Sequence, residues 1–150
     1  MHEGFIVQTA KTSENEEKEA CMAFVEYNKN PKGKKVGDCV IRAISTALHQ
    51  DWDSTYIGIM LEGFTLKDMP SANNVWGEYL KKAGYERRVV PSTCTYCYTI
   101  RDFCEDHQEG RYIVATGSHV VAVINGNYLD TWDSGDEIPV YYWEALNGIQ

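Results

Sequence analysis

The pattern of hydrophobic residues changes at about residue 111, and this change constrains the fold more than any other feature of the chain. Before it, apolar residues recur at helical spacing in segments at 38–48, 51–63, 73–83 and 99–107. After it, short apolar runs between glycine-containing turns predict strands at 112–115, 119–124, 128–132 and 138–143. Further strands are predicted at 5–7, 22–27 and 85–90. Helices followed by strands, without regular alternation of the two, predict an α+β domain whose early helices pack on a C-terminal antiparallel sheet.

The bulk properties of the chain predict a single globular domain. Its 150 residues are enough for one domain with a real core, to which residues 1–21 are expected to be peripheral. A net charge of -8 makes nucleic acid and anionic membranes unexpected partners, because both would be repelled. No apolar run is long enough to span a membrane, no export signal is visible, and the five cysteines are an odd number. We therefore expect a protein of the reducing cytoplasm.

Cys39 has the position that a reactive thiol requires. It lies at the predicted start of the helix at 38–48, directly after Asp38, which is a good N-cap residue. A helix N-terminus stabilises a thiolate, and its free N–H groups can hold a developing oxyanion. A lone cysteine is more often a small buried hydrophobe, so the interpretation as a nucleophile depends on a partner base.

His119 is the best candidate for that base, because it opens an apolar strand and so lies at the edge of the core. Its ring also needs an acceptor, and the next strand offers Asp130 and Asp133. If residues 125–127 form a three-residue loop, Ile124 pairs with Tyr128 and Asp133 falls opposite the histidine. With a two-residue Asn-Gly turn, Asp130 shares the face of His119 instead. We favour Asp133 and keep Asp130 as the alternative.

With these residues in place, the chain resembles the papain-like cysteine peptidase superfamily. Residues 37–45, Gly-Asp-Cys-Val-Ile-Arg-Ala-Ile-Ser, are similar to the cysteine motif of ovarian-tumour deubiquitinases. Residues 119–123, His-Val-Val-Ala-Val, followed by Asn127-Tyr128 and Asp133-Ser134, are similar to the His and Asn motifs of papain. The resemblance spans about residues 22–143, and small papain-like proteins of bacteria and phages are also similar.

The resemblance implies a papain-like fold and a cysteine hydrolase with a Cys39, His119 and Asp133 triad. Cys39 would attack a carbonyl of a polypeptide or other amide substrate, and His119 would move the proton. Water would hydrolyse the thioester, or an amine would intercept it in a transamidation. Papain carries a Gln six residues before its cysteine as an oxyanion donor, and this chain has Gly33 there. The backbone N–H groups of Asp38 and Cys39 are the predicted substitute.

A second cluster of cysteine and histidine residues could form a metal site. Cys94, Cys97, Cys104 and His107 have a C-x2-C-x6-C-x2-H spacing that could supply four zinc ligands. The knuckle lacks a glycine after either cysteine, and Cys104 also fits the apolar stripe of its helix, so neither zinc nor any other cofactor is favoured. The alternative function is an inactive papain-like binding module with a structural zinc. The sequence does not indicate the substrate or the oligomeric state.

Overall fold

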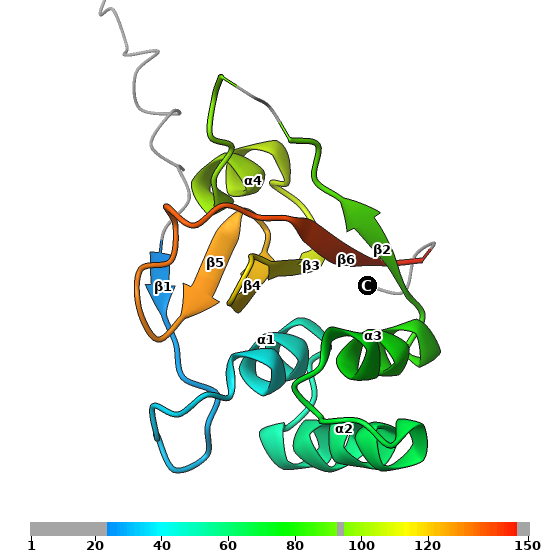
Figure 1. The fold of residues 1–150 in the computed structure, drawn as a ribbon. Helices are drawn as coiled ribbons and strands as arrows, with labels where there is room; N and C mark the ends of the chain where they lie inside the picture. Colours follow the sequence, from blue (N-terminus) through cyan, green and yellow to red (C-terminus); the bar gives the residue numbers. More distant parts are fainter. Residues whose placement is uncertain (1–23, 93–94, 147–150) are drawn as a thin grey trace, which may run out of the picture.

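The computed structural model describes residues 24–92 and 95–146, which form an α+β domain (Figure 1). The strand predicted at 5–7 and the peripheral segment 1–21 lie outside the described residues. The helices are α1 (Cys39–Ala47), α2 (Trp52–Leu66), α3 (Asn73–Lys82) and α4 (Ile100–Asp106). The strands are β1 (Phe24–Glu26), β2 (Tyr85–Val89), β3 (Arg111–Ala115), β4 (Val120–Ile124), β5 (Asn127–Asp130) and β6 (Tyr141–Ala145). The predicted α+β class is confirmed.

The strands form one mixed sheet in the order β1-β5-β4-β3-β6-β2. Its four central strands are antiparallel, as predicted for the C-terminal third of the chain. The strand from the middle of the chain, β2, extends one edge in antiparallel pairing with β6. At the other edge β1 joins β5 in parallel, and the Tyr27 N–H continues the ladder to the Asp130 carbonyl at 2.8 Å. The prediction of a purely antiparallel sheet is therefore wrong at this edge.

Helices cover both faces of the sheet (Figure 1). Alternate residues of β4 show why, since Val120 and Ala122 pack with α1 and α3 while Val121 and Val123 pack with α4. This explains the continuous apolar run of β4, which a half-exposed strand would not need. The second helix, α2, is the outermost layer, because α1 and α3 lie between it and the sheet (Figure 1).

The predicted end of α2 at Gly63 is wrong. The helix continues to Leu66, and Lys67 ends it in the left-handed region with φ 57°. Gly63 is needed for a different reason, because a Cβ at this position would lie 2.8 Å from the Asp68 carbonyl oxygen. The chain folds back tightly there, with the Asp68 N–H donating to the Gly63 carbonyl at 3.0 Å.

The turn between β4 and β5 decides which residues share a face of the sheet. Ile124 pairs with Asn127 and Val123 with Tyr128, so the connection is the two-residue turn Asn125-Gly126. Both turn residues have positive φ, 47° and 74°, as the type I′ turn favoured in hairpins requires. The three-residue loop, with Ile124 paired to Tyr128, is therefore wrong. Every residue of β5 is shifted by one position relative to that prediction.

Candidate active site

The thiol of Cys39 lies at the first residue of α1 and is partly buried. Asp38 is the N-cap, but its carboxylate makes no capping bond to the helix. It instead accepts from Arg42 Nε at 2.8 Å, Trp52 Nε1 at 3.0 Å and Asn30 Nδ2 at 3.1 Å. No capping bond from Asp38 therefore satisfies the first N–H groups of α1, whose partial positive charge favours a thiolate at Cys39.

The His119 ring is held in one position by its surroundings. A tight turn fixes its backbone, with the His119 N–H donating to Thr116 Oγ1 at 3.0 Å and the Thr116 N–H to the His119 carbonyl at 2.8 Å. On the ring, Nε2 lies 2.5 Å from Asp130 Oδ2, which leaves Nδ1 for the thiol of Cys39. Trp132 packs beside the imidazole with ring centroids 5.1 Å apart.

Asp130, the alternative third member, is the carboxylate that contacts His119. It is buried, and it also accepts from Ser134 Oγ at 2.7 Å and from the Thr131 N–H at 2.7 Å. The preference for Asp133 is wrong for this reason: the two-residue turn puts Asp130 on the face of His119. Asp133 is half exposed and binds elsewhere, to Arg101 Nη2 at 2.8 Å and to the Tyr128 hydroxyl at 2.5 Å.

The electrostatics favour a thiolate beside an imidazolium. Burial acts to raise the pKa of the Cys39 thiol, but the hydrogen bonds from His119 and the Val120 N–H, with the charges of His119 and Arg42, lower it overall. Burial acts to lower the pKa of His119, yet its bonds to Asp130 and Cys39 raise it to about 9. The same imidazole and Ser134 outweigh burial at Asp130 and lower the pKa of that carboxyl. Both shifts favour the thiolate–imidazolium form of the pair over the neutral form.

Arg42 connects the two buried carboxylates of the site. Its Nε bonds Asp38, and its Nη1 lies 3.2 Å from both Asp130 Oδ1 and Thr131 Oγ1. A continuous polar network therefore runs from Asp38 through Arg42 and Asp130 to His119. The site residues expected from the sequence did not include Arg42, Asn30 or Trp52. The available signal was an arginine four residues after an aspartate on a helix face that is otherwise buried.

Of the two predicted backbone oxyanion donors, one is already engaged. The Asp38 N–H already donates to the Val36 carbonyl at 2.8 Å, so it is occupied, whereas no bond from the Cys39 N–H to another described residue is seen. Gly33, where papain has its Gln, lies in the preceding loop with φ 63°. In the same loop Asn30 turns its amide towards the helix start, and one N–H of this group is used by Asp38. The amide of Asn30 therefore keeps a second N–H that Asp38 does not use.

The described residues of the possible zinc cluster, Cys97, Cys104 and His107, lie in different environments. Cys97 is exposed, whereas Cys104 is buried in the apolar core, where burial raises its pKa to about 12. His107 stacks on Phe103 at 3.8 Å and its Nδ1 bonds the Phe103 carbonyl at 2.8 Å. Cys94 lies outside the described residues. Among the residues that are described, no three potential ligands gather in a way that could hold a metal ion.

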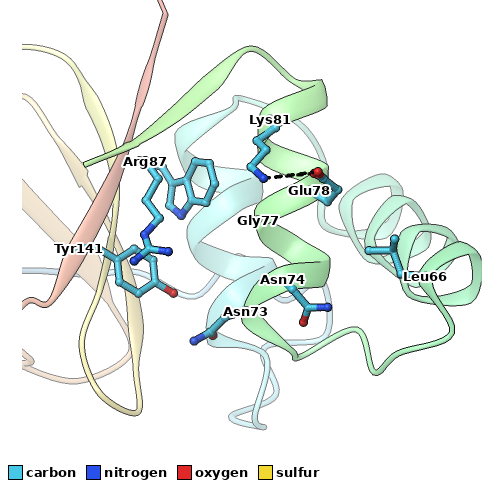
Figure 2. Close-up of a pocket in the computed structure, with 9 residues that line it drawn as sticks. Leu66, Asn73, Asn74, Gly77, Glu78, Lys81, Arg87 and Tyr141 are labelled. Atoms are coloured by element: carbon cyan, nitrogen blue, oxygen red, sulfur yellow. Dashed lines mark hydrogen bonds and ion pairs between the residues drawn. The ribbon is translucent and has the colours of Figure 1, made fainter. Parts of the chain in front are cut away.

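A cavity of about 540 Å³ lies between α3 and the β2 and β6 strands (Figure 2). The guanidinium of Arg87 stacks over Tyr141 at 4.4 Å on one wall, and Lys81 pairs with Glu78 at 3.4 Å on the other. Neither Cys39, His119 nor Asp130 lines it. Tyr141 pairs with Ala115, which pairs with Val120, so the cavity begins two strands away from the catalytic candidates.

Comparisons with family models, with curated proteins and with solved structures give no match to this chain. The candidate site therefore has to be judged on its own geometry. Within the described part of the chain, no helix is both long enough and apolar enough to cross a membrane.

Proposed function

We propose that the protein is a papain-like cysteine hydrolase that cleaves a peptide, isopeptide or related amide bond. The observation that carries the proposal is the contact chain from the thiol at a helix start through His119 to a buried Asp130. These three groups have the roles of nucleophile, general base and orienting carboxylate. The order Cys, His, Asp along the chain and the α+β architecture are consistent with the same superfamily.

The proposed reaction begins with attack of the Cys39 thiolate on the carbonyl carbon, which forms a C–S bond and an oxyanion. His119, protonated in the ion pair, gives its proton to the leaving nitrogen as the C–N bond breaks. Water then attacks the thioester while His119 takes its proton, and release of the acid restores the thiolate. An amine in place of water would give transamidation.

Two groups are proposed to stabilise the oxyanion. The Cys39 N–H is at the open end of α1, and the second N–H of Asn30 extends from the loop before it. Asp38 holds the Asn30 amide, so this carboxylate orients the donor and does not cap the helix. Asn30 thus takes the role that a glutamine has in papain, from a different loop position.

An acyl-enzyme test examines this proposal without knowledge of the natural substrate. The protein is mixed with a small activated ester such as p-nitrophenyl acetate, quenched in acid and digested for mass spectrometry. We expect acetyl on Cys39 in excess over the exposed Cys97, and burst kinetics that Cys39→Ala removes while His119→Ala slows them. Equal acetylation of Cys39 and Cys97 would reject the hydrolase and favour an inactive binding module of the same fold.

A further inference from the structure

The outermost helix, α2, carries large apolar side chains on the face that it exposes to solvent. Its inner face buries Thr55, Ile59 and Gly63 against the rest of the domain. Its outer face carries Ile57, Leu61 and Phe64 with exposed fractions of 57%, 60% and 72%. A run of large exposed apolar side chains marks a surface that binds another protein.

The outer face forms a continuous stripe. Ile57, Met60 and Phe64 follow one another at spacings of three and four residues, which is the spacing of a helix-packing seam. Beside its C-terminal half lies a hollow of about 380 Å³ whose lining includes Met60, Phe64 and Met69. The stripe therefore offers both projecting side chains and a hollow to receive one.

The same stripe ends in opposite charges. Asp53 lies four residues before Ile57 on the helix, and Lys67, the C-cap residue, places its side chain over Phe64, so both lie on the outer face. No ion pair to another described residue is seen for either, and Lys67 Nζ rests 3.9 Å over the Phe64 ring. The neighbouring acids are already engaged, because Asp51 accepts from Ser54 and Asp68 accepts from Asn74.

We propose that the stripe, defined as Asp53, Ile57, Met60, Leu61, Phe64 and Lys67, binds the same stripe of a second copy with the two α2 helices antiparallel. In that orientation a twofold axis passes near Met60, Ile57 meets Phe64 of the other copy, and Asp53 meets Lys67 at both ends. A parallel pair would oppose Asp53 to Asp53 and Lys67 to Lys67, so the charges select the antiparallel arrangement. The dimer does not depend on the proposed hydrolase activity.

Sedimentation velocity on the full chain tests the dimer. One helix of this length is about 22 Å long, so the interface is small and we expect a dissociation constant in the micromolar range, seen as concentration-dependent dimers between about 1 and 200 µM. Phe64→Lys is expected to leave a folded monomer throughout this range, because the residue is exposed. Val89→Lys, at an equally exposed apolar residue on β2, is the matched control and should dimerise normally.

A charge exchange tests the orientation. Lys67→Asp or Asp53→Lys alone should weaken dimerisation about tenfold, since each creates two like-charge contacts per dimer, and the double variant should restore it. A wild-type chain that stays monomeric at 200 µM would overturn the proposal and point to a different partner protein. So would a dimer that survives Phe64→Lys, or a double variant no tighter than the single ones.

Discussion

Asp130 and Asp133 differ by three positions in sequence and by their whole environment in the structure. One is buried between His119 and Ser134, and the other is half exposed beside Arg101. Both are candidate carboxylates by residue type, so their contacts alone distinguish their roles. The two aspartates, three residues apart at and after the end of β5, therefore make a matched pair for substitution.

Asp130→Asn should lower the reactivity of Cys39 towards iodoacetamide at pH 7 by about tenfold. Asn cannot supply the negative charge that holds the imidazolium in place, so His119 stabilises the thiolate less, and a rise of one unit in the pKa of Cys39 removes about nine-tenths of the thiolate. Asp133→Asn is the control and should leave the alkylation rate within about twofold. An equal loss in both variants would contradict the assignment of Asp130.

Arg42 is expected to be the most sensitive residue of the site for stability. Arg42→Met leaves Asp38 and Asp130 buried without their cation, and breaking a buried pair in this way costs about 3–5 kcal/mol of unfolding free energy. Urea denaturation measures this cost. Arg88→Met removes an exposed pair with Glu144 and should cost less than about 1 kcal/mol. Similar costs at the two arginines would contradict the buried network.

Single elements of the fold were predictable where local sequence determines them. Apolar spacing identifies α1 and α3 almost to the residue, and the Thr99 capping box identifies the start of α4. The C-terminal end of α2 was predicted wrongly at Gly63. In the sequence alone, a glycine that lets another backbone segment pack closely cannot be told from one that ends a helix. The sequence allows two conformations of the β4–β5 turn, and the longer one pairs His119 with Asp133, whereas the observed two-residue turn puts Asp130 beside it.

Gly126→Ala tests the turn that sets this register. Gly126 has φ 74°, where an alanine costs about 1–2 kcal/mol, and the added Cβ would lie 3.0 Å from the Gln108 side chain. Urea denaturation should report a loss of at least that size. Gly117→Ala, in the neighbouring β3–β4 turn, meets nothing within 4 Å and lacks a positive φ, so its effect should stay within about 0.5 kcal/mol. A larger loss of unfolding free energy in Gly117→Ala than in Gly126→Ala would contradict the two-residue turn with positive φ at Gly126.

The molecule as a whole brings together residues that are far apart in sequence, and this part could not be predicted. Cys39 and His119 were identifiable from a helix start and a strand start, because each has a local pattern. The network of Arg42 with Asp130 joins residues 88 positions apart, and nothing local to either marks the contact. The parallel addition of β1 to β5 is likewise a long-range pairing that strand patterns alone do not specify.

The central claim is that Cys39 and His119 form a thiolate–imidazolium pair in the folded protein. The pKa of Cys39 is lowered, so its thiolate persists to a lower pH than usual, and the pKa of His119 is raised to about 9, so its imidazolium persists to a higher pH. The ion pair exists at pH values between these two pKa values. Hydrolysis should therefore decline above about pH 9, where His119 loses the proton that it gives to the leaving group.

The most direct measurement is the rate of Cys39 alkylation by iodoacetamide from pH 4 to 10, with the site read by mass spectrometry. We predict that Cys39 reacts with an apparent pKa below the ordinary value of about 8.5 and that His119→Ala raises it towards that value. Exposed Cys97 in the same samples supplies the internal reference. Titration of Cys39 near 8.5, unchanged by His119→Ala, would contradict the ion pair.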